Sequence, residues 1–256
     1  MKRSLSVNLN KIALIRNSRE GSYPDLLAHA DVCIENGADG ITVHPRPDLR
    51  HITPKDVFDL SDLISNKKKL TNKSIELNVE GNPFALKKIN YPGFIEIVNS
   101  VQPHQCTLVP DGVNQLTSDH GFDLKVNSDK LYPVIQYLKS KGIRICLFMD
   151  PDEEQIKLAA ELEVDRIELF TGPYAAAWRK GDISNIFEKY LISASIANKL
   201  GMGVNAGHDL NLLNLKKFCS IPNLQEFSIG HALIVDAISM GLKKAIESYI
   251  NIIKGS

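Results

Sequence analysis

The stretch from Gly40 to His51 joins an apolar run to a cluster of proton-transfer and cationic side chains. It reads Gly-Ile-Thr-Val-His-Pro-Arg-Pro-Asp-Leu-Arg-His, so it begins as an apolar strand and ends as a loop that carries His44, Arg46, Arg50 and His51. Imidazoles change charge near neutral pH, and guanidinium groups bind phosphate or carboxylate through paired hydrogen bonds. This stretch therefore predicts a place where an anion is held while protons move beside it.

Two glutamates lie inside otherwise apolar runs, Glu76 in Ser-Ile-Glu-Leu and Glu168 in Arg-Ile-Glu-Leu. Burial raises the pKa of a carboxyl group toward the range that a general acid or base needs. The alternative is a buried ion pair with an arginine, and one glutamate alone would not distinguish the two. Two such glutamates, together with three histidines at the ends of apolar runs, favour catalysis. Glu80, Asp111 and Asp150 are further acids at or near such ends.

Two Gly-His pairs come late in the chain, in Asn205-Ala-Gly-His208 and Ile229-Gly-His231-Ala. Glycine lets the backbone approach a ligand closely. The second pair continues into an apolar helical segment from Ala232, whose free N–H groups would face the same place. In (β/α)8 barrels, such loops and helix N-termini often hold a phosphate group.

Eight short apolar runs alternate with segments of helical periodicity. Several runs are almost continuously hydrophobic, which is typical of parallel strands covered by helices. Thr53-Pro54 and the acids from Asp152 suit helix N-termini, and Gly37 suits a helix end. The expected strands are residues 5–10, 40–45, 74–80, 105–111, 144–150, 166–172, 203–207 and 226–230.

This alternation predicts a single (β/α)8 barrel domain over residues 1–256, because eight strand–helix units in about 250 residues are typical of that fold. Its chemistry is expected at the C-terminal ends of the strands. The runner-up, a doubly wound open sheet, usually has a glycine-rich turn after its first strand. Here no glycine precedes Gly21. Residues 81–104 and 173–200 leave room for an extra helix or a lid.

Composition narrows the class of protein. Lys+Arg 30 against Asp+Glu 30 gives a formal net charge of zero, so neither nucleic acid nor an anionic membrane is an expected partner. The start of the chain does not resemble a signal peptide, and no apolar run approaches the roughly 18 residues of a membrane span. These features predict a cytoplasmic protein. The four cysteines form no Cys-x-x-Cys pair, and without a His-x-His or His-x-x-x-His pair we expect no metal.

Five motifs, in order and at barrel spacing, resemble the pyridoxine 5′-phosphate synthase family over nearly the whole chain. The resemblance implies a (β/α)8 barrel with extra helices that assembles as a homo-octamer. It also implies a transferase-type, ring-closing synthase of vitamin B6 biosynthesis. That enzyme condenses 1-deoxy-D-xylulose 5-phosphate with 3-amino-2-oxopropyl phosphate into pyridoxine 5′-phosphate, phosphate and water, without metal or organic cofactor. The motifs are Asp39-Gly-Ile-Thr-Val-His44 with Arg50-His-Ile-Thr53, Asp150-Pro-Asp-Glu-Glu-Gln-Ile-Lys157, Glu168-Leu-Phe-Thr-Gly172, Val204-Asn-Ala-Gly-His208 and Ile229-Gly-His231-Ala.

The resemblance also implies a role for individual residues. His44 and Glu76 would accept protons, His208 would donate one, and Glu168 would stabilise charge during the reaction. The expected ligands of the aminoketone phosphate are Asn8, Arg19, Gly230 and His231, and those of the deoxyxylulose phosphate are Arg46, His51 and Thr117.

Three candidate substrate-binding positions depart from the family pattern. Asn10 and Lys11 stand where the family often has Asp and His, and Asp209 stands where glycine is common. Lys11 can pair with a phosphate as a point charge but cannot act as a neutral imidazole. The charge of Asp209 could repel a phosphate. We expect altered affinity rather than lost activity.

Two other functions stay open. The departures would also fit a catalytically altered barrel that binds phosphorylated metabolites without turning them over. A Schiff-base aldolase is the third hypothesis, because Lys11 is the one lysine at the C-terminal end of an expected strand.

Overall fold

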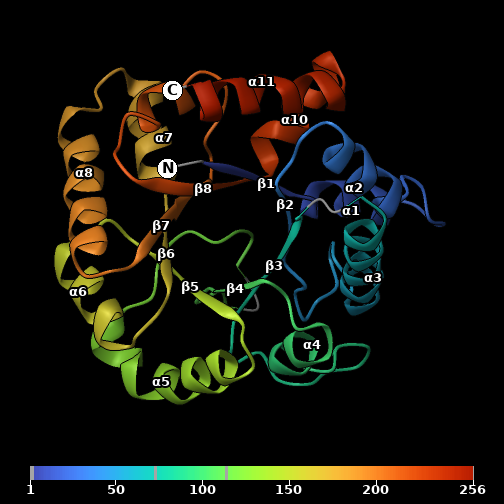
Figure 1. Cartoon of the computed structure of the whole chain (residues 1–256), viewed down its shortest axis with the longest axis horizontal. Coiled ribbons are helices and arrows are strands. Elements are labelled where there is room, and N and C mark those ends of the chain that lie inside the picture. The colour runs from blue at the N-terminus through green and yellow to red at the C-terminus, as the bar shows by residue number, and fades with distance from the viewer. Residues whose placement is uncertain (1–2, 72–73, 113–114, 256) are drawn as a thin grey trace.

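A computed structural model describes residues 3–71, 74–112 and 115–255. Eight parallel strands pair in chain order, and β8 closes on β1, so the prediction of a (β/α)8 barrel is confirmed (Figure 1). Each expected strand is present, and most end one to three residues before the expected boundary. The strands are β1 (Ser4–Asn8), β2 (Gly40–Val43), β3 (Glu76–Gly81), β4 (Gln105–Leu108), β5 (Arg144–Met149), β6 (Arg166–Leu169), β7 (Gly203–Ala206) and β8 (Leu224–Ile229).

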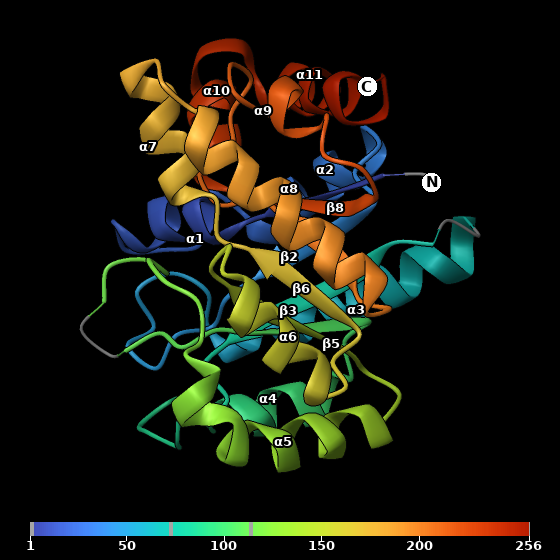
Figure 2. The same ribbon diagram turned by 90° about the vertical axis from the view of Figure 1, so that its left-hand side faces the viewer.

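Helices surround the barrel, with α4 and α5 on one side and α10 and α11 on the opposite side (Figure 2). The connection over residues 173–200 holds two helices as its length allowed, whereas residues 81–104 hold one helix and a loop. The helices are α1 (Asn10–Asn17), α2 (Leu26–Glu35), α3 (Pro54–Thr71), α4 (Phe94–Val101), α5 (Leu124–Ser140), α6 (Glu153–Glu161), α7 (Gly172–Lys180), α8 (Ser184–Lys199), α9 (Leu215–Phe218), α10 (His231–Met240) and α11 (Leu242–Gly255).

Local side-chain bonds fix several helix starts. Thr53 Oγ1 accepts a hydrogen bond from the N–H of Asp56 at 3.3 Å, and Asp56 Oδ2 accepts one from the N–H of Thr53 at 2.7 Å, which is a reciprocal cap before α3. Asp152 caps α6 by accepting from the N–H of Gln155 at 3.0 Å. Both expected helix starts are confirmed.

Strand residues alternate between an apolar outer face and a polar lumen. On β1, Leu5 and Val7 are buried among the helices, whereas the hydroxyl of Ser6 hydrogen-bonds to that of Thr42 on the neighbouring β2 at 2.7 Å. Because side chains in a strand alternate with a period of two, residues 76, 78 and 80 of β3 share the lumen face. The two ends of that lumen hold different chemistry.

Within the described ranges no helix is both long and apolar enough to cross a membrane.

Candidate active site

A cavity of about 400 Å³ opens at the C-terminal ends of the strands, where a barrel carries its chemistry. Its volume lies in the range of small-molecule sites. Every residue that was expected from the sequence to act in catalysis or substrate binding lines it, except Glu76 and Arg19. The candidates that do line it are Asn8, Asn10, Lys11, His44, Arg46, His51, Thr117, Glu168, His208, Asp209, Gly230 and His231.

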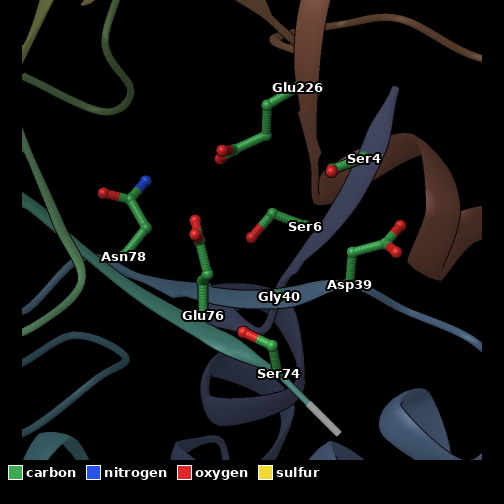
Figure 3. A pocket seen from close by; sticks show the side chains of 8 residues that line it. All are labelled: Ser4, Ser6, Asp39, Gly40, Ser74, Glu76, Asn78 and Glu226. Atoms are coloured by element: carbon green, nitrogen blue, oxygen red, sulfur yellow. The ribbon is translucent and has the colours of Figure 1, made fainter. Parts of the chain in front are cut away.

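Glu76 lies at the opposite end of the barrel, so its expected place in the site is wrong. It is the first residue of β3 and lines a separate cavity of about 170 Å³ (Figure 3), where its carboxylate and that of Glu226 turn toward the same space. Arg144 donates two hydrogen bonds to it, one of them at 3.2 Å. Burial alone would raise the pKa of Glu76, but the hydrogen bonds and charge of Arg144 outweigh it and lower that pKa. Glu76 therefore forms an ion pair with an arginine, which was the alternative to a catalytic role.

Arg19 also lies outside the cavity. The sequence did not predict α1, which carries the chain away from the mouth and ends at Asn17, so that Arg19 follows it as an exposed residue. The neighbouring Arg16 points inward instead and pairs with Asp56 at 2.6 Å. In this conformation Arg19 contributes nothing to the cavity wall.

His44 is held as a neutral imidazole. It follows β2, it is buried, and its backbone N–H donates to Asn10 Oδ1 at 2.9 Å. Burial, followed by the positive charges of Arg46, His51 and Arg50, lowers the pKa of His44 well below its ordinary value. A neutral ring at pH 7 can accept a proton.

Asp111 organises the groups around His44. Its Oδ2 lies 3.6 Å from Nε2 of His44, pairs with Arg46 and accepts from Ser118 Oγ at 2.9 Å. Arg46 also donates to the carbonyl of Gln115 at 3.0 Å, so the guanidinium is fixed from two sides. The sequence marked Asp111 as an acid near a strand end, but it could not show these partners.

Glu80 and Glu168 face the mouth from the lumen. Glu80 accepts from Asn8 Nδ2 at 3.2 Å, and burial, with the charges of Asp111 and Glu226, raises the pKa of Glu80 to about 8. Burial, with the charges of Glu80 and Glu226, raises the pKa of Glu168 well above its ordinary value. Its Oε2 makes no hydrogen bond within the described ranges. Glu80 can therefore exchange protons near neutral pH, and burial favours the protonated form of Glu168.

His208 faces this cluster from the loop after β7. Its Nε2 lies 3.0 Å from Oγ1 of Thr117, which comes from the loop after β4. The rings of Phe148 and Phe170 pack against the imidazole, with centroids 6.3 and 5.2 Å away. An imidazole and a hydroxyl thus meet across the mouth.

The N-terminus of α10 presents backbone groups that can hold an anion. Gly230 is the N-cap residue, so the first N–H groups of α10 have no partner within the helix. A Cβ on Gly230 would lie 3.0 Å from Cβ of Asn8, and one on Gly207 would lie 1.8 Å from the carbonyl oxygen of Ser228. Only glycine fits at position 207, so the two strand-end glycines allow close packing around this helix end.

A cationic cluster on the cavity wall offers a second place that can hold an anion. Lys11, Arg46, Arg50 and His51 all line the cavity, and the charges of the three cations act on His51. Nδ1 of His51 accepts from the N–H of Ile52 at 2.9 Å, which leaves Nε2 to carry a proton. Burial and then the charges of Arg46 and Lys11 lower the pKa of His51 to about 3. Crowded positive charge around a neutral donor suits a phosphate group.

A metal site is not formed by the described residues: no three His, Cys, Asp or Glu side chains among them are grouped to hold an ion.

The closed barrel and the acid–base groups at its mouth define the chain as a (β/α)8 enzyme. The sequence pattern of the family described as pyridoxal phosphate biosynthesis protein PdxJ matches residues 5–255, and the chain belongs to this family. It is similar to the pyridoxine 5′-phosphate synthase of Xanthomonas oryzae pv. oryzae, with 46% identity over 257 residues that cover 100% of this chain and 98% of that protein. The Xylella fastidiosa enzyme of the same name is 46% identical over 97% of this chain and 94% of its own.

Solved structures of other proteins share the fold. Thiamine phosphate pyrophosphorylase from Pyrococcus furiosus superposes with a TM-score of 0.58 at 11% identity, covering 99% of this chain and 96% of that one. Phosphoribosyl anthranilate isomerase from Thermotoga maritima gives 0.58 at 12% identity and covers both chains completely. At these identities the likeness concerns the barrel alone.

Proposed function

We propose that the chain is a pyridoxine 5′-phosphate synthase, which condenses 1-deoxy-D-xylulose 5-phosphate with 3-amino-2-oxopropyl phosphate. One observation carries the proposal: a single cavity joins two anion-binding positions and places proton-transfer groups between them. Two phosphorylated substrates need two such positions. Schiff-base formation, phosphate elimination and ring closure need repeated proton transfers, which the carboxyl groups and imidazoles can supply. The names of the relatives support the same reaction.

Each substrate is assigned to one position. The aminoketone phosphate would bind at the N-terminus of α10, with Gly230, His231 and Asn8. The deoxyxylulose phosphate would bind on the cationic side, where Asn10 and Lys11 line the cavity beside its other ligands. Those other ligands would be Arg46, His51 and Thr117.

The proton-transfer roles follow from the surroundings of each group. The neutral imidazole of His44 accepts a proton. Glu80 takes the acceptor role that the sequence assigned to Glu76, and a pKa of about 8 lets it also return the proton near neutral pH. Glu168 stabilises charge during the reaction, and His208 donates a proton to a leaving oxygen.

We further propose a cytoplasmic homo-octamer. Apolar side chains remain exposed on the neighbouring helices α1 and α10, among them Ile15 at 46% and Ile238 at 76%, and such patches often mark contacts between copies. Sedimentation of the purified protein measures the assembly, and cell fractionation measures the location.

A discontinuous assay tests the reaction. Both phosphorylated substrates are incubated with the protein and a chelator, and pyridoxine 5′-phosphate is detected by fluorescence and mass. We expect product with the chelator present. Binding of each substrate without any product would contradict the proposal and favour a barrel that only binds phosphorylated metabolites.

A further inference from the structure

Asp209 has a backbone conformation that few residues adopt. It follows His208 in the loop after β7, and its φ is 64°, in the left-handed region where Gly, Asn and Asp are the usual residues. Asn214 Nδ2 donates to the carbonyl of Asp209 at 3.2 Å and holds the turn. The backbone therefore fixes where the carboxylate can reach.

That carboxylate lies beside the inner nitrogen of the neighbouring imidazole. Asp209 Oδ2 is 3.3 Å from Nδ1 of His208, and Nδ1 is buried without a well-aligned hydrogen bond among the described residues. The other ring nitrogen, Nε2, is 3.0 Å from Thr117 Oγ1. One side of the ring thus meets a carboxylate, and the other meets a hydroxyl on the cavity wall. Catalytic hydrogen bonds are often loosely aligned without substrate and tighten when it binds.

We propose that Asp209 is a positioning residue that keeps the Nδ1–H tautomer of His208, so that Nε2 faces the substrate and performs the proton transfer. The effect of Asp209 on catalysis rests on the proposed function, whereas its effect on the tautomer of His208 does not depend on that function. The proton moves only at Nε2: the neutral ring first takes a proton there from the substrate, which forms an imidazolium that the ionised Asp209 stabilises, and the ring then gives that proton to the leaving oxygen and is neutral again. The carboxylate of Asp209 thus acts through the imidazole.

The surroundings of Asp209 keep it charged. The contact with His208, together with the charges of Arg179 on α7 and His231 on α10, lowers the pKa of Asp209 despite its partial burial. The same positive groups reduce the repulsion between the carboxylate of Asp209 and a phosphate bound at the N-terminus of α10. This explains how the cavity tolerates a carboxylate at this position.

Two substitutions test the proposal without straining the turn. Asn and Gly both adopt the left-handed backbone, so D209N removes only the charge and D209G removes the whole side chain. D119N is the matched control, because Asp119 forms an exposed pair with His120 at 2.6 Å outside the cavity wall. Each variant is measured in the full chain by ¹⁵N NMR of labelled histidine, by steady-state kinetics and by thermal unfolding.

We expect His208 to be protonated at Nδ1 in the wild type and to lose that preference in D209G, with D209N between them. In D209G kcat should fall roughly 10–100-fold, as when a carboxylate that orients a functional histidine is removed, at nearly unchanged KM for both substrates. The melting temperature should stay level or rise, which excludes a folding defect. An unchanged tautomer and unchanged kcat in D209G would overturn the proposal. A wild type that makes no product would sink the proposed function, while the NMR result would still decide the positioning.

Discussion

Glu76 and Glu80 lie on the same strand and the same lumen face, yet they differ in chemistry. They are about 13 Å apart along β3 and belong to opposite ends of the barrel. Glu76 is 39% exposed and paired with Arg144, which lowers its pKa. Glu80 is buried beside Asp111, and its pKa is raised to about 8. The partner and the depth of burial, not the residue type, decide which carboxyl group can exchange protons at pH 7.

Glutamine substitutions at the two positions test this difference, and E80Q should have the largest effect on kcat of the variants considered. E80Q should lower kcat about 10²- to 10⁴-fold, the usual contribution of a general acid or base, because the amide cannot exchange the proton. E76Q should stay within a few-fold of wild type, since its ion pair lies at the far end. Steady-state kinetics of the two variants measure the contrast. Equal losses in both would contradict the division between the two ends.

The same E80Q variant should become more stable than wild type as pH rises. A folded-state pKa of about 8, against an ordinary 4.5, means that the folded chain binds more protons than the unfolded chain between these values. The stability that the protonated carboxyl group of Glu80 contributes is therefore fully present below about pH 4.5 and is lost as pH rises through about 8. The difference between E80Q and wild type should grow by a few kcal/mol across this window. Urea denaturation at pH 5, 7 and 9 measures it, and a pH-independent difference would show that folded Glu80 is ionised throughout.

Breaking the ion pairs at the far end should cost stability but leave catalysis intact. Arg166 lies 3.0 Å from Glu226, which is almost fully buried, so R166M leaves that carboxylate with Arg144 at 3.8 Å and Gln105 at 3.3 Å. We expect unfolding to become easier by about 1–3 kcal/mol, less than for a fully buried pair because Arg166 is partly exposed.

The double variant R166M/E226Q should recover part of this loss, because the unpaired charge is gone. Urea denaturation measures stability, and kcat of the folded enzyme measures activity. A loss of kcat in R166M comparable with that of E80Q would mean that the far end takes part in the reaction.

The sequence predicted the barrel and most of the mouth for physical reasons. Apolar runs that alternate with helical periodicity allow few folds, and the polar residues that follow parallel strands must gather at one end. His44, His208 and Gly230 were found in this way. Their positions depend on local order along the chain, which the sequence contains.

The missed features depend on boundaries and long-range contacts. The expected strand over residues 74–80 contained both Glu76 and Glu80, and only the observed start at Glu76 places Glu80 at the mouth. Arg19 was misplaced because the first strand ends at Asn8 and an unpredicted helix follows. Two partners of Asp111, His44 and Arg46, come from the distant loop after β2, and no local pattern shows such contacts.

Substitution of Lys11 should have the smallest effect of these variants, and it tests only the mouth of the barrel. It is the second residue of α1, and its charge helps to lower the pKa of His51, after burial and Arg46. K11M should raise KM for deoxyxylulose phosphate about threefold to tenfold and weaken its salt dependence, because one partly solvated cation contributes modestly to phosphate binding. K11H, which replaces the permanent charge with an imidazole, should lie between K11M and wild type.

K55M on α3 is the control, since Lys55 is exposed and pairs with Asp59 away from the cavity. Steady-state kinetics at two salt concentrations measure all three variants. An unchanged KM in K11M would mean that Arg46 and His51 hold the phosphate without this lysine. Retention of kcat in K11M would contradict a Schiff-base aldolase that uses it, because an enzyme without its imine-forming amine cannot turn over. A loss of kcat as large as that of E80Q would instead place Lys11 among the catalytic residues and make the cationic side of the mouth chemically active.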